Sequence, residues 1–296
     1  MQSRQEYLRA VKLLPPSLRE YALEVSDEIA ERAEEIRLRA GRPLSFVVGD
    51  EERDAAETHV LKPSELQFVL EIATRASAHS YADSIRMGFV TAEGGCRVGL
   101  CGTAISDNDM ITGLRRISSI CIRIPREKRG CADSVFGLLS AGGFESVLIV
   151  SPPGGGKTTI LRELTRLISD GGKRVALVDE RNEVAGLHEG LPCFDVGRRT
   201  DVLTGAPKAG GVMMVLRSMA PQIIAFDEIT APEDVEAVYL AANCGVRLLA
   251  TAHADSVDDL KRRPLYRKML EGGIFRRVLI IENYGGKRKY TVEELL

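Results

Sequence analysis

The chain contains no tryptophan, and only 5% of its 296 residues are aromatic. Proteins that bind single-stranded nucleic acid stack the bases on aromatic side chains, so this composition argues against a base-stacking surface. The formal net charge is −2 at pH 7, and no overall positive field therefore favours nucleic acid or acidic lipid. A motor on single-stranded nucleic acid stays open as an alternative, but nucleic acid is not the expected partner.

The chain also lacks long apolar runs, paired cysteines and a leader-like beginning. No stretch of about 18 or more residues is uncharged and apolar, so no transmembrane helix is expected. The six cysteines are scattered and include no Cys-x-x-Cys pair, which is typical of reduced cytosolic thiols rather than of zinc or disulfide sites. Residues 1–9 are polar and do not resemble a signal peptide. A cytoplasmic protein is expected.

One glycine-rich segment lies between a strand pattern and a helix pattern. Residues 151–159 read S-P-P-G-G-G-K-T-T, after an apolar run at 147–150 and before an amphipathic stretch at 160–168. This order of strand, loop and helix is the one that a phosphate-binding P-loop requires. The alternative, a glycine turn that happens to contain Lys-Thr, is disfavoured by both flanking elements. The segment predicts that the chain binds ATP.

Each residue type in this loop has a use. The glycines let successive backbone N–H groups point at phosphate oxygens, and the start of the helix adds its positive end. Lys157 can reach the β- and γ-phosphates, and the Thr158 hydroxyl can bind Mg²⁺. Ser151 stands where the usual pattern has glycine, which weakens the match only slightly. The expected nucleotide-binding residues are Gly154, Gly155, Gly156, Lys157, Thr158 and Thr159.

The texture of the sequence changes near residue 130. Before that point helical stretches mix with alternating strands, which predicts a smaller α+β domain over residues 1–130. From residue 131 short apolar strands alternate with helices, which predicts an α/β domain over 131–296 with a parallel sheet covered on both faces. The fold class is therefore α/β, a RecA-like P-loop NTPase domain preceded by an α+β domain. The expected strands of the sheet are 147–150, 175–178, 223–226 and 246–250.

A terminal hairpin is expected after these strands. Residues 277–281 form a strand pattern that is apolar after Arg277, and Tyr284-Gly285-Gly286 predicts a turn. The basic residues 287–289 that follow are expected on the solvated side of this hairpin.

Polar residues follow the strands at their carboxyl ends, where ligands bind in an open α/β sheet. Asp227 and Glu228 follow the third strand and predict a Walker B pair, in which Asp227 holds Mg²⁺ and Glu228 polarises the attacking water. A helix N-cap is the alternative interpretation. Asp179 and Glu180 follow the second strand and can support the metal or position water, unless they form a solvated turn. His253, after the fourth strand, can sense the γ-phosphate or serve as a structural histidine.

Phosphoryl transfer also needs positive charge at the γ-phosphate, often from an arginine of another part of the chain or another subunit. Each candidate can also be an ordinary surface residue. An arginine supplied by a neighbouring copy would imply a ring or a dimer. The candidates are Arg217, Arg198, Arg199, Arg123 and Arg126.

Several further segments resemble those of a known family. They are E-I-R-L-R-A-G-R-P-L at 35–44, V-D-E-R-N-E at 178–183, D-V-G-R-R-T-D-V-L at 195–203, L-R-S-M-A-P at 216–221 and A-T-A-H at 250–253. Over nearly its whole length the chain is similar to the stage III sporulation protein AA family, which is related to the ring-shaped ATPases of type II and type IV secretion and of pilus systems. The resemblance implies a Mg²⁺-dependent ATP hydrolase that forms a hexamer. It would act in the mother-cell cytoplasm at the base of the channel to the forespore, docked on a membrane-embedded channel protein.

The same resemblance assigns roles to single residues. Asp179 and Glu180, with Glu183, match the so-called Asp box, and His253 matches the His box. Glu228 matches the Walker B glutamate, and Arg217 matches an arginine that precedes Walker B. The chain departs from secretion ATPases at Asp227, where they have glycine, and at Thr230, where they have arginine. A nucleotide-gated scaffold with little turnover therefore stays an alternative. The expected catalytic residues are Glu228, Lys157, Asp179, Glu180, His253 and Arg217, and the expected metal ligands are Thr158 and Asp227.

Overall fold

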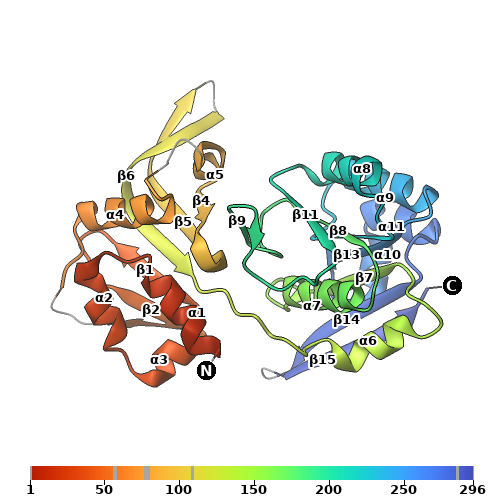
Figure 1. Ribbon diagram of the computed structural model, residues 1–296, viewed down its shortest axis with the longest axis horizontal. Helices are drawn as coiled ribbons and strands as arrows, with labels where there is room; N and C mark the ends of the chain where they lie inside the picture. Colours follow the sequence, from red (N-terminus) through yellow and green to blue (C-terminus); the bar gives the residue numbers. More distant parts are fainter. Residues whose placement is uncertain (1, 56–58, 77–80, 108–109, 285–286, 296) are drawn as a thin grey trace. The chain divides into compact units, whose positions relative to one another are not determined.

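The structure is a computed structural model that describes residues 2–55, 59–76, 81–107, 110–284 and 287–295. The chain divides into two compact units (Figure 1). The first consists of Met1–Arg126 with His188–Cys193, and the second of Glu127–Leu187 with Phe194–Leu296. The segment His188–Cys193 therefore belongs to the first unit although it lies far along the sequence. A single division at residue 130, as predicted, does not account for this segment. No helix of the described residues is long and apolar enough to cross a membrane.

In the described part of the first unit, six strands form an antiparallel sheet in the order β3-β2-β1-β6-β5-β4. Alternate residues of β1 are buried, and Ile36 and Leu38 pack with Phe46 in the core. The strands are β1 Glu35–Arg39, β2 Ser45–Val48, β3 Glu51–Asp54, β4 Phe89–Thr91, β5 Arg97–Asp107 and β6 Met110–Arg123. The helices are α1 Gln2–Val11, α2 Pro16–Leu23, α3 Asp27–Arg32, α4 Pro63–Ala73, α5 Ala82–Arg86 and the 3₁₀ turn η2 Glu93–Gly95.

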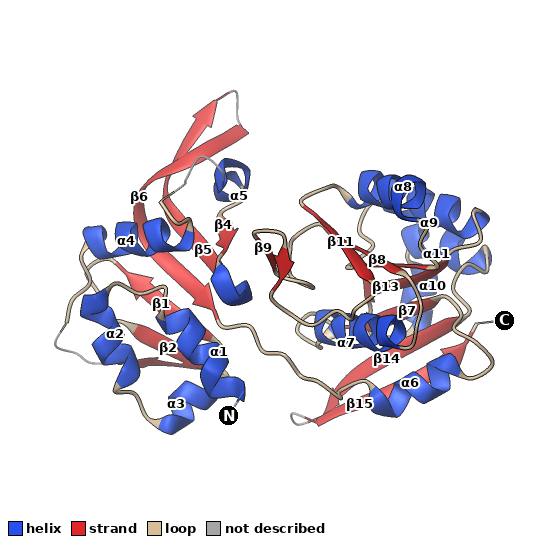
Figure 2. Cartoon of the chain, viewed as in Figure 1, coloured by secondary structure: helices blue, strands red, loops and turns tan. Residues whose placement is uncertain are grey.

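The described part of the second unit holds a seven-stranded sheet in the order β11-β8-β12-β13-β7-β14-β15. The strands run parallel from β11 to β14, and β15 closes the edge antiparallel to β14 (Figure 2). They are β7 Val147–Ser151, β8 Val175–Asp179, β11 Thr200–Thr204, β12 Ile223–Phe226, β13 Arg247–His253, β14 Arg277–Tyr284 and β15 Lys287–Glu294. A short hairpin, β9 Leu187–His188 and β10 Leu191–Pro192, lies outside this sheet.

The strand period of two divides this sheet into two apolar faces. Leu148 and Val150 of β7 pack into one core with helices α8, α9, α10 and α11, whereas Val147 and Ile149 pack into the other with α6 and α7. Both faces are covered, so the central strands are apolar throughout. The helices are α6 Asp133–Ser140, α7 Lys157–Asp170, α8 Lys208–Met219, α9 Pro232–Asn243, α10 Val257–Arg262 and α11 Pro264–Glu271.

The predicted parallel α/β sheet is confirmed, with two differences in its strands. The fourth strand was expected to end at residue 250, but β13 continues to His253 because Thr251 and Ala252 are buried and pair with β7. The edge strand β11 was not predicted. The terminal hairpin forms as expected, although residues 285 and 286 of its predicted turn lie outside the described residues.

Candidate functional site

The loop between β7 and α7 has the backbone of a phosphate-binding turn. Gly154 and Gly156 have φ angles of 74° and 92°, a region that favours glycine. Gly155 is required for a different reason, since a β-carbon there would lie 2.2 Å from the hydroxyl oxygen of Ser151. Ser151 is fully buried and donates to the carbonyl of Pro152 over 2.9 Å. The serine at the first motif position therefore fits because residue 155 has no side chain.

Lys157, the first residue of α7, is buried at the carboxyl end of the sheet. Its ammonium donates to the carbonyls of Ser151 (3.0 Å) and Pro152 (3.1 Å) and approaches Nδ1 of His253 at 2.6 Å. Burial lowers the pKa of Lys157, while Glu228 and then Asp227 act in the opposite direction. The ammonium is thus held at the loop by weak neutral acceptors, which phosphate oxygens can replace with stronger, charge-assisted bonds.

His253 joins this lysine to Glu228, the residue predicted to be the Walker B glutamate. Its Nε2 lies 2.8 Å from a carboxylate oxygen of Glu228, whose other oxygen is 3.8 Å from Arg181. Glu228 has a φ of 48°, an uncommon conformation for a residue with a side chain. Backbone strain of this kind clusters at functional sites, where the surrounding structure holds it. The Glu228 backbone N–H donates to Thr251 over 2.8 Å, and this bond fixes the strained residue.

Asp227 connects the P-loop helix with two strand ends. One carboxylate oxygen accepts from the Thr158 hydroxyl at 2.8 Å, and the other accepts from the Thr251 hydroxyl at 2.5 Å. Helix α9 is capped instead by Asp234, which accepts from the N–H groups of Thr230 and Ala231. The helix-cap interpretation of Asp227 is therefore wrong.

The oxygens of Thr158 and Asp227 also form a fitting pair for Mg²⁺. Magnesium in phosphate-transfer sites takes one or two carboxylates, substrate phosphates and waters rather than a complete protein cage. A hydroxyl and a carboxylate oxygen 2.8 Å apart at the start of α7 match this donor set. No cluster of three or more histidine, cysteine or acidic side chains that could bind a metal occurs among the described residues.

Asp179 is buried and organises the turn that follows β8. Its two oxygens accept from the N–H groups of Glu183, Val184 and Ala185 at 2.8 to 3.0 Å. Burial raises the pKa of Asp179 to about 6, and these N–H groups oppose the rise. Arg162 of α7 donates to two carbonyls of the same turn and stacks over the ring of Phe194. The solvated-turn interpretation of Asp179 is wrong, because this side chain is buried. No sequence pattern pointed to Arg162.

Of the other predicted residues, Thr159 stays next to Lys157 and Thr158, whereas Glu180 and Arg217 make other contacts or lie in solvent. Glu180 pairs with the buried Lys208 at 2.6 Å, next to Asp234. Arg217 is exposed in the last turn of α8, just before the amino end of β12, so the structure does not bring it to the P-loop. Thr159 lies in the first turn of α7.

The remaining candidate arginines form ion pairs or hydrogen bonds with residues other than the predicted site residues. Arg123 pairs with Glu35 at 3.3 Å, Arg126 donates to the carbonyl of Ala33, and Arg198 pairs with Asp170 at 3.5 Å. Arg199 lies beside the same helix, since its N–H donates to the hydroxyl of Ser169. Within the second unit, neither Arg198 nor Arg199 bonds to Lys157, His253 or Glu228 in the residues that the structure describes.

An arginine that was expected in solvent lies at the loop instead. A β-carbon on Gly156 would be 2.5 Å from the guanidinium carbon of Arg288 on β15, so this side chain rests against the N-terminus of α7. Arg288 also bonds to Tyr290, and its charge acts on the thiol of Cys131. The expectation that the whole basic run faces solvent is therefore wrong for Arg288.

Comparison with known proteins supplies a family. Residues 2–292 match the family described as "Sporulation stage III, protein AA". The chain is 35% identical over 280 residues to the Bacillus subtilis protein named stage III sporulation protein AA, covering 93% of this chain and 91% of that protein.

Solved structures with the same fold include a pilus motor and a bacterial ATPase. The pilus retraction motor PilT, crystallised with ADP, has a TM-score of 0.63 at 16% identity, covering 89% of this chain and 79% of its own. The Legionella pneumophila ATPase DotB has a TM-score of 0.58 at 17% identity, with 88% and 76% covered. At these identities the likeness shows the fold alone.

Proposed function

The chain belongs to the sporulation stage III protein AA family and has the fold of secretion and pilus ATPases. We propose that it is a Mg²⁺-dependent ATP hydrolase. The observation that carries the proposal is the continuous contact from Lys157 through His253 to Glu228. One imidazole contacts Lys157 through Nδ1 and Glu228 through Nε2, and this supports a role for the lysine in phosphate binding and for the carboxylate in activating water. A scaffold that only binds nucleotide has no need of this second group.

Each residue has a definite task in this proposal. The triphosphate takes the place of the two loop carbonyls around the Lys157 ammonium, and the loop N–H groups bind the phosphate oxygens. Thr158 and Asp227 hold Mg²⁺, which supplies charge neutralisation at the phosphates. Glu228 orients the attacking water and accepts its proton. His253 contacts both the lysine and the glutamate, so it is placed to sense whether the γ-phosphate is present.

Arg288 supplies positive charge from within the same chain. Its guanidinium lies at Gly156, the N-cap of a 14-residue helix whose positive end favours phosphate. A guanidinium donates in a planar fork to phosphate oxygens, whereas the lysine acts as a point charge. We assign Arg288 to the phosphates of the nucleotide. Arg217, which is exposed, is then free to serve a neighbouring copy.

The family suggests where this activity is used. We propose that the chain forms a hexameric ring in the mother-cell cytoplasm and docks on a membrane-embedded protein of the channel to the forespore. ATP hydrolysis would then drive or time the assembly of that channel. The support for this part is family membership and the fold, and not a contact in the structure.

Steady-state hydrolysis of ATP against protein concentration tests the proposal. Activity per chain should rise cooperatively with concentration, because a ring completes sites that a single chain leaves incomplete. Glu228→Gln should keep ATP binding and lose about 100-fold or more of the turnover, the usual contribution of a general base. Glu233→Gln, an exposed glutamate on α9, is the matched control. Tight ATP binding without turnover above that of Glu228→Gln would favour the scaffold.

A further inference from the structure

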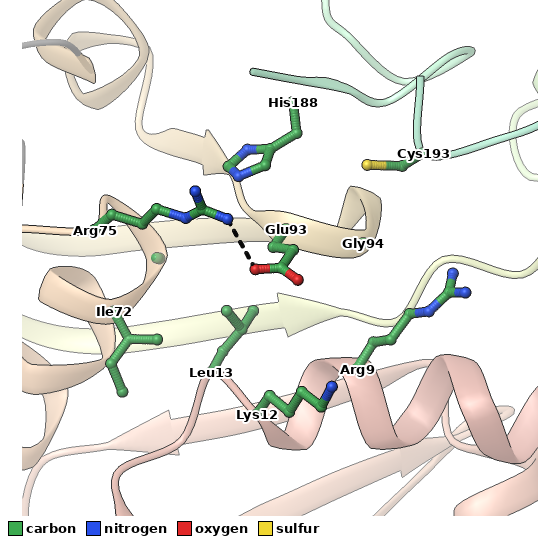
Figure 3. Close-up of a pocket in the computed structure, with 10 residues that line it drawn as sticks. Arg9, Lys12, Leu13, Ile72, Arg75, Glu93, Gly94, His188 and Cys193 are labelled. Carbon is green, nitrogen blue, oxygen red and sulfur yellow. Dashed lines mark hydrogen bonds and ion pairs between the residues drawn. The ribbon is translucent and has the colours of Figure 1, made fainter. Parts of the chain in front are cut away.

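The first unit contains a cavity of about 370 Å³ that is separate from the P-loop cluster. Its walls come from α1, the end of α4, the 3₁₀ turn η2 and the segment His188–Cys193 (Figure 3). Leu13, Ile72 and Ala73 give it an apolar side. Three cationic residues, Arg9, Lys12 and Arg75, line the rest together with Glu93. A cavity with an apolar wall and a few convergent polar groups is typical of a small-molecule site.

One buried side chain in this cavity, His188, has a ring nitrogen without a hydrogen-bond partner. His188 is only 8% exposed, and its Nε2 is the single buried side-chain nitrogen or oxygen without a hydrogen-bond partner in the part of the chain that the structure describes. The imidazole extends from its strand toward Arg75 and Glu93 (Figure 3). Burying a polar atom without a partner costs about 1–3 kcal/mol, so such atoms point to a bound group.

The charges around His188 are not balanced within the pocket. Arg75 is neutralised by Glu93 at 3.0 Å and by Glu189 at 2.5 Å. Arg9 lies in the last turn of α1 and Lys12 comes directly after the helix ends at Val11, and neither side chain forms an ion pair with any described residue. Two uncompensated positive charges beside an unpartnered imidazole match a dianion with several oxygens better than a carboxylate, which carries one charge and two oxygens.

We propose that this pocket binds a small molecule through a phosphate group, held by Arg9, Lys12 and Nε2 of His188. The apolar wall formed by Leu13 and Ile72 would contact the organic part of the ligand. The site is distinct from the proposed ATP site, because it lies in the other unit and shares no residue with it. A bound ligand could affect the proposed nucleotide site through the backbone, because His188 lies shortly after the turn at 183–185 whose N–H groups donate to Asp179.

Histidine side-chain NMR of the full chain tests this with inorganic phosphate as the probe. His188 reports the pocket, and His253, which is 2.6 Å from Lys157, reports the P-loop, so the two sites give separate signals. Single histidine-to-glutamine substitutions assign the imidazole resonances. Phosphate at constant ionic strength should shift the His188 resonances saturably. Acetate at the same concentrations should not.

The matched variants lie on one helix. Arg9→Gln should weaken the phosphate response of His188 at least fivefold, whereas Arg4→Gln removes the same charge from α1 outside the pocket and should leave it unchanged. Lys12→Gln repeats the test if Arg9→Gln does not fold. The proposal would be overturned if the His188 resonances did not respond to phosphate, or if they responded equally to acetate. It would also be overturned if the Arg9 and Lys12 variants both bound phosphate as tightly as the wild type. A response confined to His253 would overturn it as well, while leaving the ATP site intact.

Discussion

The ammonium of Lys157 lies 2.6 Å from Nδ1 of His253, and a lysine ammonium can only donate. Nδ1 therefore accepts, and the hydrogen of the imidazole is on Nε2, where it donates to Glu228 at 2.8 Å. The tautomer of His253 is thus set by the lysine of the P-loop. When the lysine turns to a phosphate, Nδ1 loses its donor and the bond to Glu228 is free to change.

His253→Ala should therefore affect turnover more than binding. We expect kcat for ATP to fall about 10- to 100-fold, which is less than the loss of the general base itself would cause, because His253 only positions Glu228. The dissociation constant for ATP should change by less than about threefold, since the loop and Lys157 remain. Kinetics and equilibrium binding on the same preparation separate the two effects. His59→Ala, which removes a histidine paired with Glu65 in the first unit, is the control. Equal losses in binding and turnover would contradict the sensing role.

Arg288→Gln should weaken nucleotide binding. A charged hydrogen bond contributes about 1.5–3 kcal/mol, so ADP and ATP should bind about 10- to 100-fold more weakly by calorimetry. Lys289→Gln removes a neighbouring charge that is exposed and paired with Glu282, and it should bind nucleotide like the wild type. Identical affinities for the two variants would show that Arg288 does not reach the phosphates.

Gly155→Ala should destabilise the loop, because the new β-carbon would meet Ser151 at 2.2 Å. Overpacking of this kind costs about 1–3 kcal/mol. We expect a lower Tm and weaker ATP binding. Ser151→Gly removes the clashing side chain, so the double variant Ser151→Gly/Gly155→Ala should recover a large part of both losses. A double variant no better than Gly155→Ala would mean that another contact requires the glycine.

The buried carboxyl of Asp179 predicts a pH dependence of stability. Its pKa in the folded chain, about 6, is above the ordinary value of 3.8, so the folded state holds the proton more tightly. This contribution is fully present below about pH 4 and is lost as the pH rises through 6. Between pH 5 and 7 the loss amounts to about 1 kcal/mol.

Urea unfolding at pH 5 and pH 7 measures this contribution. Asp179→Asn cannot titrate, so the free energy of unfolding of the wild type minus that of the variant should shrink by about 1 kcal/mol from pH 5 to pH 7. Asp201→Asn, at an exposed position on β11, should show no such change. A difference that stays constant or grows with pH would contradict the raised pKa.

The strands that the sequence predicted well are those that are buried on both faces. Residues 147–150 are apolar without interruption because each face of the sheet packs against helices. β11 is the opposite case: it lies at the edge of the sheet, none of its residues is buried, and its sequence T-D-V-L-T resembles a loop. The end of β13 was expected at residue 250 because Thr251 is polar. Thr251 is nevertheless fully buried and donates to Asp227, so the strand continues beyond it.

The candidate site follows the same division between local and distant signals. Asp227 and Glu228 follow β12 directly, and His253 is the last residue of β13. Lys157 and Thr158 follow β7 after the short glycine loop, and the parallel sheet brings these strand ends to one edge. Arg288 reaches the loop only because β14 pairs with β7 and β15 folds back on β14. His188 gave no pattern at all, because the hairpin that carries it has strands of only two residues. Long-range pairing of this kind has no local signature.

The position of β14 has a consequence for synthesis of the chain. β7 has β13 on one side and β14 on the other, and all three reach the sheet from different parts of the sequence. During synthesis, the P-loop and its helix leave the ribosome long before residues 277–284. The edge of β7 that later pairs with β14 is therefore unpaired in the incomplete chain. Open strand edges attract foreign strands. A nascent chain that stalls before β14 therefore carries a complete phosphate-loop sequence next to an unpaired strand edge, which makes it prone to aggregation.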